Sequence, residues 1–244
     1  MATPIRSVCN TLIELFYPSN CVGCGHGQSP GVLLCGQCRK SVTRIAEPYC
    51  DVCSRPFEGL ISGIFACPNC EDRPPAFDCV VSKYHAKGLL RDLIHRFKYG
   101  RQFYLRGVLA QYLVEAMQDE RILAQPADCI VPVPLHPTRL RERGFNQAEA
   151  LAEAVFKRGA VPRIPILRCI QRKRYTQTQT RFDRSERMLN LRNSFAMRKN
   201  SDVRGKHAVL LDDILTTGST LHECALVLRE AGAETVRAIT VARG

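Results

Sequence analysis

Short apolar runs alternate with longer amphipathic stretches over the last two thirds of the chain. Apolar runs of strand length predict strands at residues 79–84, 129–133, near 164–170, 208–211 and 236–241. The helical spacing of apolar residues between them predicts helices at about 105–117, 146–157 and 219–231. Because strands and helices alternate, the pattern predicts an α/β fold with a parallel sheet flanked by helices.

The distribution of cysteines divides the chain into two parts. Ten of the 13 cysteines precede residue 80, and Pro74-Pro75 marks the exit from this cysteine-rich part. We therefore predict a module with an N-terminal helix and two zinc sites over residues 1–78, and the α/β domain over residues 79–244. A helical apolar face at residues 5–16 lacks a Lys/Arg-rich polar side, so we expect it to dock onto the protein's own core.

Eight cysteines of the first part form four Cys-x-x-Cys pairs. Each pair can supply two thiolates from one tight turn, and two pairs complete a tetrahedral zinc site. We predict two structural zinc ions, with disulfide pairing as the alternative that a cytosolic chain disfavours. The spacing leaves open whether neighbouring pairs share an ion or interleave, and His26 is interpreted as a bystander. The predicted ligands are Cys21, Cys24, Cys35, Cys38, Cys50, Cys53, Cys67 and Cys70.

Positive charge is concentrated after the cysteine-rich part. The formal net charge is +12, and residues 137–204 alone hold 17 Lys/Arg against 6 Asp/Glu. Such an excess favours a phosphate-rich partner, although a solvated basic face without a partner fits the charge equally well. No stretch has the length of a transmembrane helix, and the first residues lack a signal-peptide pattern. We expect a cytoplasmic protein without stable membrane insertion.

The most informative segment is the apolar run at residues 209–211 with the polar residues that follow it. Two carboxylates stand at the carboxyl end of a predicted strand, where they can bond a ribose diol or hold Mg²⁺. The hydroxyl-rich turn after them opens a predicted helix, whose first N–H groups can bind a phosphate. Neither a P-loop nor a G-x-G-x-x-G motif is present, so the sequence supports neither a P-loop NTPase nor a dinucleotide-binding site. A solvated turn with a capped helix is the alternative to a phosphate site. The predicted ribose 5-phosphate site comprises Asp212, Asp213, Thr216, Thr217, Gly218, Ser219 and Thr220.

This segment closely resembles the fingerprint of type I phosphoribosyltransferases, which bind phosphoribosyl pyrophosphate (PRPP). The resemblance implies that the acid pair contacts the ribose hydroxyls and that residues 216–220 hold the 5-phosphate. It also implies a pyrophosphate loop in the position of residues 130–139, and a flexible loop that closes over the ligand. Candidate contacts of these parts are Arg139, Arg174 and Lys98.

Nearly the whole chain resembles the competence protein F family, a branch of that superfamily associated with the uptake or use of external DNA. The resemblance implies PRPP binding with Mg²⁺. It also implies single-stranded DNA and competence or DNA-processing proteins as partners. Besides the Cys-x-x-Cys pairs and the acid pair with its loop, it is carried by residues 97–100, 131–135, 139–147 and 176–180.

A basic segment without helical or strand periodicity precedes the last predicted strands. It interleaves cations with aromatic rings, which suits single-stranded nucleic acid. It also stands in the position of the flexible loop, and the sequence does not choose between these uses and a loop that only covers the sheet. The candidate DNA contacts are Arg172, Lys173, Arg174, Tyr175, Arg181 and Phe182.

Two functions therefore compete. In the one we favour, a PRPP-binding protein handles or takes up single-stranded DNA in natural transformation, and turnover of PRPP is not required. In the alternative, an active phosphoribosyltransferase joins ribose 5-phosphate from PRPP to a nitrogenous base and releases pyrophosphate. The sequence leaves open whether the protein is an enzyme.

Overall fold

The computed structural model describes residues 20–29, 31–59, 63, 65–157, 159, 161–174 and 191–244. The helix predicted at residues 5–16 lies outside these ranges, as do Tyr175, Arg181 and Phe182 of the basic segment. Among the described residues, no helix has the length and apolar character needed to cross a membrane.

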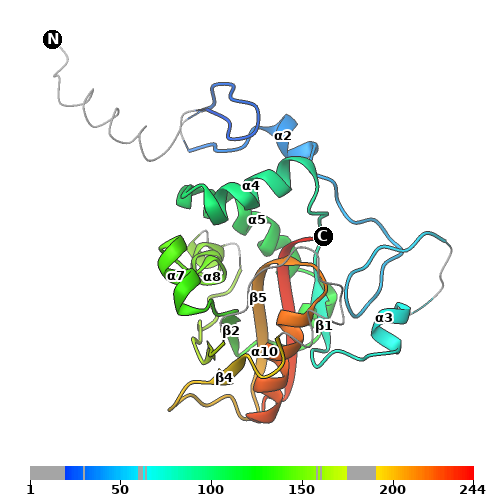
Figure 1. Cartoon of the computed structure of the whole chain (residues 1–244). Helices are drawn as coiled ribbons and strands as arrows, with labels where there is room; N and C mark the ends of the chain where they lie inside the picture. Colours follow the sequence, from blue (N-terminus) through cyan, green and yellow to red (C-terminus); the bar gives the residue numbers. More distant parts are fainter. Residues whose placement is uncertain are drawn as a thin grey trace.

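A parallel sheet of four strands forms the centre of the α/β part (Figure 1). Its strands are β1 (Cys79–Val81), β2 (Cys129–Pro132), β5 (His207–Leu215) and β6 (Thr235–Arg243), in the spatial order β1-β6-β5-β2. The strands are largely buried along their length, as expected for a parallel sheet covered by helices. The predicted α/β fold is confirmed.

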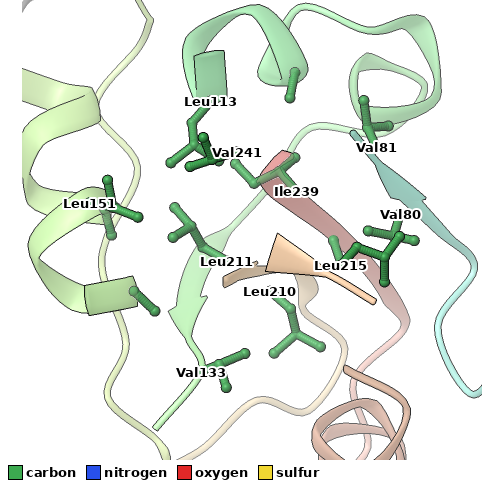
Figure 2. Close-up of a cluster of buried hydrophobic side chains, with 14 of the residues drawn as sticks. Val80, Val81, Leu113, Val133, Leu151, Leu210, Leu211, Leu215, Ile239 and Val241 are labelled. Carbon is green, nitrogen blue, oxygen red and sulfur yellow. The ribbon is translucent and has the colours of Figure 1, made fainter. Parts of the chain in front are cut away.

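Helices cover both faces of this sheet. α5 (Arg106–Met117) and α8 (Gln147–Lys157) pack together on one face, and α10 (Ser219–Glu230) packs on the other. Figure 2 shows the core where α5 and α8 pack on the sheet and fully buried aliphatic side chains meet. These side chains are Leu113 of α5, Leu151 of α8, and Leu211, Ile239 and Val241 of the strands.

The remaining elements connect these layers or lie in the cysteine-rich part. They are α2 (Gly36–Lys40), α3 (Pro68–Glu71), α4 (Gly88–Tyr99), η1 (Phe103–Leu105), α6 (Glu120–Leu123), α7 (Pro137–Arg143), β3 (Ile170–Arg172) and β4 (Phe195–Met197).

The strand predicted near residues 164–170 is wrong. Ile166 makes a single bridge to Ile130, because Pro165 beside it has no N–H to donate to a ladder. The chain instead enters β3, which pairs antiparallel with β4 in a separate two-stranded sheet. The strand predicted to end at residue 84 also ends earlier, because Tyr84 bridges to Arg44 rather than continuing β1.

Strand β5 extends beyond its predicted end at residue 211. It continues through the acid pair to Leu215, because β6 stays paired with it as far as Arg243. Its other neighbour, β2, ends at Pro132, which lies opposite Leu211. The acid pair therefore lies on a strand that projects past β2, at the carboxyl edge where open α/β sheets bind ligands.

Candidate PRPP site and zinc centres

The two carboxylates of the acid pair lie next to a lysine from α4. The Lys98 Nζ is 2.8 Å from Asp213 Oδ1, and the two side chains are 19% and 8% exposed. The Asp213 N–H donates to Asp212 Oδ1 over 2.8 Å, which orients the Asp212 carboxyl group on the strand. Lys98 follows the buried Phe97 on the last turn of α4, so the packing of that helix brings its ammonium group to the acids.

Burial and mutual repulsion control the charge of this pair. Burial and the neighbouring Asp213 carboxylate together raise the pKa of Asp212 to about 7, although Lys98 acts in the opposite direction. Burial alone would lower the pKa of Lys98, but the attraction of Asp213 prevails and raises it. The lysine therefore stays charged while the pair holds negative charge at a cost. A divalent cation, or hydroxyl groups that donate to the carboxylates, would relieve that cost.

A cavity of about 130 Å³ opens beside the acid pair, and we call it the acid-pair cavity. Four cationic side chains face its two carboxylates, so its walls carry an excess of positive charge that suits a polyanion. The cations are Lys98, Arg139, Arg143 and Arg172, and the other lining residues are Val133, Pro134, Leu135, Asn146, Gln147, Ala148, Asp212, Asp213 and Thr220.

The turn between α7 and α8 places two of these lining residues. Gly144 ends α7 with a φ of 79°, which lets the chain reverse into α8. The Arg143 Nη1 group then donates to Gln147 Oε1 over 2.8 Å, and its Nη2 group donates to the Tyr99 hydroxyl over 3.0 Å. Gln147 is 2% exposed, and its Nε2 group has no hydrogen-bond partner among the described residues.

The hydroxyl-rich loop after β5 faces a second cavity. Gly218 has a φ of 80° and directly precedes α10, whose first turn leaves N–H groups without helical partners. The hydroxyls of Thr217 and Ser219 lie 2.9 Å apart, next to these N–H groups. Such a helix start binds phosphate through N–H groups and the helix dipole.

We call this second space, of about 430 Å³, the phosphate-loop cavity. Thr216 to Ser219 line it, whereas Thr220 lines the acid-pair cavity, so the loop is shared between the two spaces. Its other lining residues are Cys53, Arg55, Pro56, Asn69, Cys70, Arg73, Pro75, Phe77, His85, Leu215, His222, Arg243 and Gly244.

The structure distributes the other predicted contacts unevenly. Arg139 and Lys98 both line the acid-pair cavity. Arg172, interpreted from the sequence as a DNA contact, also lines that cavity, with its guanidinium 5.4 Å from the Phe195 ring. Lys173 and Arg174 are exposed and line neither cavity. Their roles stay predictions.

Sequence reasoning missed several cationic residues of the two cavities. Arg143 lies four residues after Arg139, and this helical spacing could have revealed it as a second contact on the same face of α7. Arg55 and Arg73 belong to the cysteine-rich part, and no local signal connects them with a loop at residues 216–219.

The eight cysteines form two separate tetrads, and each contains two pairs that are neighbours in the sequence. All candidate ligand atoms of a tetrad lie within 4.8 Å of one another. The Sγ atoms of Cys24 and Cys35 are 3.8 Å apart, and those of Cys53 and Cys67 are 3.7 Å apart. A tetrahedral site with Zn–S bonds of about 2.3 Å requires about 3.8 Å between sulfurs, whereas a disulfide requires about 2.0 Å. The donor sets thus fit zinc, and the pairs do not interleave.

Comparisons with known proteins agree with both halves of this description. Residues 12–71 match the double zinc ribbon domain family, and residues 141–244 match the phosphoribosyl transferase domain family. The two cysteine tetrads are therefore the structural zinc sites of a double zinc ribbon.

Relatives match over most of the chain. Competence protein F of Haemophilus influenzae is 31% identical over 232 residues, which are 93% of this chain and 98% of that protein. The DNA utilization protein YhgH of Salmonella typhi is 34% identical over 84% of this chain and 94% of that protein. A solved structure of the allosteric regulatory enzyme of purine biosynthesis is 25% identical, with a TM-score of 0.35. That match covers 57% of this chain and 26% of that one.

Proposed function

Because the chain belongs to the competence protein F family and carries a phosphoribosyltransferase domain, we propose that it binds PRPP with Mg²⁺ and handles single-stranded DNA during the uptake or use of external DNA. The relatives are named for competence or DNA utilization, which supports a role related to competence.

PRPP binding is supported by the position of the acid pair beside a loop that two cationic cavities share. PRPP has a phosphate on C5 and a pyrophosphate on C1, with the ribose diol between them. The phosphate-loop cavity suits the C5 phosphate, and the acid-pair cavity suits the pyrophosphate. This arrangement is the single observation that carries the proposal, because a solvated turn would need no second cationic cavity.

Each residue then has a definite task. Asp212 and Asp213 accept hydrogen bonds from the ribose hydroxyls, and their charge would hold Mg²⁺ near the pyrophosphate. Bound there, Mg²⁺ would neutralise part of the pyrophosphate charge. Arg139 and Arg143 contact the pyrophosphate oxygens, for which guanidinium groups are suited. Lys98 holds Asp213 in place and favours the ionised form of the pair.

An active phosphoribosyltransferase is the second candidate. The observation that favours it is the cluster of cations in the acid-pair cavity, where the charge of a departing pyrophosphate would develop. Stabilising that charge would help the bond between C1 and pyrophosphate to break. Release of pyrophosphate from PRPP in the presence of a nitrogenous base separates this enzyme from a protein that only binds PRPP.

The DNA part of the proposal is supported by charge and by the relatives. Residues 137–204 carry a large excess of Lys and Arg, and Lys173 and Arg174 are exposed. Exposed cations bind the nucleic acid backbone with an affinity that falls as salt rises. Other competence or DNA-processing proteins are proposed partners on the names of the relatives alone.

Calorimetric titration with PRPP and Mg²⁺ tests the proposal. We expect wild-type protein to bind PRPP, the Asp212→Asn/Asp213→Asn variant to lose this binding, and an Asp202→Asn variant, altered at an exposed acid, to retain it. Repeating the titration with a single-stranded oligonucleotide, at two salt concentrations, tests the DNA part. Absence of PRPP binding by the wild type would refute the PRPP proposal, and salt-independent or absent oligonucleotide binding would refute the DNA proposal.

A further inference from the structure

One wall of the phosphate-loop cavity is formed by the second zinc ribbon, which we define as the part around Cys50, Cys53, Cys67 and Cys70. Arg55 lies two residues after Cys53, and Arg73 lies three residues after Cys70. Both arginines are exposed, both line the cavity, and neither forms an ion pair with a described residue. Two guanidinium groups are thus directed to the same space as the loop at residues 216–219.

The ribbon is fixed to the edge of the sheet, so this wall has a defined position. The Val80 N–H of β1 donates to the Val52 carbonyl over 2.8 Å, and the Ser54 hydroxyl donates to the Val80 carbonyl over 2.8 Å. The Arg243 Nη1 group of β6 donates to the Cys53 carbonyl over 2.7 Å. Ser54 is 1% exposed, so these bonds are shielded from water. The residues before Arg55 are therefore held by these hydrogen bonds against β1, the edge strand of the sheet, and against the end of β6.

The segment that follows Arg73 is held by α10, the helix that the phosphate loop opens. The Ala76 N–H donates to Nδ1 of His222 over 3.0 Å, and Asp78 forms an ion pair with Arg229. A Cβ at Gly218 would lie 3.8 Å from the Phe77 ring, so this segment also packs next to the loop itself. Both arginines are consequently anchored close to the first turn of α10.

The charge and the size of the cavity fit a phosphate. Arg243 adds a third guanidinium group to the two arginines of the ribbon, and no Asp or Glu among the described residues lines the cavity. A volume of about 430 Å³ corresponds to about fourteen waters at about 30 Å³ each, several times the size of one phosphate group. The space therefore leaves room for long arginine side chains to close on a phosphate that sits on the loop.

We propose that Arg55 and Arg73 bind the phosphate group seated on the loop Thr216–Ser219, so that the second zinc ribbon is part of the phosphate site. The inference rests on the proposed function in one respect, namely that the loop holds a phosphate. The ligand class is a sugar phosphomonoester, with ribose 5-phosphate as its simplest member. Charge-assisted bonds from guanidinium to phosphate are strong, and we expect each arginine to contribute about tenfold in affinity.

The test compares ribose 5-phosphate with magnesium pyrophosphate as calorimetric probes of full-length, zinc-loaded protein. We expect the Arg55→Ala/Arg73→Ala variant to bind ribose 5-phosphate about a hundredfold more weakly and to bind magnesium pyrophosphate as the wild type does. The matched control is Arg39→Ala/Lys40→Ala, which removes two exposed cations from the first ribbon and should change neither affinity. Zinc content and thermal unfolding verify that both variants are folded.

The outcomes separate the two levels of the argument. If the wild type binds ribose 5-phosphate and the Arg55→Ala/Arg73→Ala variant binds it equally well, the ribbon is no part of the site while the proposed function stands. If both variants weaken binding equally, the effect is one of net charge and the inference is also overturned. If the wild type binds neither probe, the proposed function and this inference fall together.

Discussion

Replacing Lys98 by methionine should destabilise the protein through the acid pair. The Lys98–Asp213 ion pair is largely buried, with side chains 19% and 8% exposed and a separation of 2.8 Å. Removing one partner of a buried pair costs about 3–5 kcal/mol, because the other charge is left without compensation. The partial exposure of Lys98 places the expected loss near the lower end, at about 3 kcal/mol. For a chain of this length that loss lowers Tm by roughly 6–12 °C.

The loss should depend on pH in a defined direction. The pKa of Asp212 is raised to about 7 in the folded protein, so this group binds its proton more tightly than in the unfolded chain. Its contribution to stability is therefore complete below its ordinary pKa near 4 and is lost as pH rises through about 7. Without Lys98 the two carboxylates repel each other with less compensation, and the Lys98→Met variant should lose more stability at pH 8 than at pH 5.

Urea unfolding of four variants without Mg²⁺ measures this effect. They are Lys98→Met, Asp213→Asn, the double variant, and a Lys173→Met control at an exposed lysine. The double variant should recover most of the loss, since neither charge is then left alone. A loss below about 1 kcal/mol for Lys98→Met, or a double variant no more stable than Lys98→Met, would refute the reasoning.

Three further predictions concern binding and the metals. The affinity for Mg²⁺ with PRPP should fall by up to tenfold per pH unit below about pH 7, because protons compete for Asp212. Calorimetry at several pH values measures this affinity, and an affinity that does not change with pH would contradict the prediction. Replacing Gly218 by valine should cost about 1–2 kcal/mol in unfolding free energy and at least tenfold in PRPP affinity. Its φ is 80°, and the control is Gly205→Val, at an exposed glycine with a φ of 64° that lines neither cavity, which should lose stability but keep PRPP affinity. A strong chelator should release two zinc ions per chain, which a zinc-responsive dye can count. The Cys67→Ser variant should lack the zinc ion of the second tetrad and keep that of the first. Loss of both ions in this variant would contradict separate tetrads.

The sequence predicted the elements whose signals are local. The apolar runs of β2 and β6, the helix after Gly218 and the four Cys-x-x-Cys pairs depend on residues close together in the chain, and all lie where they were expected. Burial of Phe97 in the core fixes the last turn of α4 and brings Lys98 to the acid pair.

The features that sequence reasoning missed depend on contacts between distant segments. β5 runs on to Leu215 because β6 remains beside it, which no window of local sequence contains. Arg55 reaches the phosphate-loop cavity because Ser54 is bonded to Val80, and that attachment is a property of the assembled domains. Arg172 belongs to a basic segment whose composition is typical of nucleic acid binding. It lines the acid-pair cavity instead, because β3, which contains it, pairs with β4.

The strand order has a consequence for how this chain folds. β1 is synthesised long before the strand it pairs with, since its partner in the sheet is β6 and Cys79 is matched with Arg237. Pairings between such distant residues form slowly because the intervening chain must first be ordered. Each zinc ribbon contains all four ligands of its own metal ion and can bind it before the sheet is complete. The second ribbon reaches its final position only after β6 has formed, because Arg243 of β6 donates to the Cys53 carbonyl. The phosphate-loop cavity would therefore form only after the whole sheet has formed, so ligand binding to this cavity would indicate that folding of the sheet is complete.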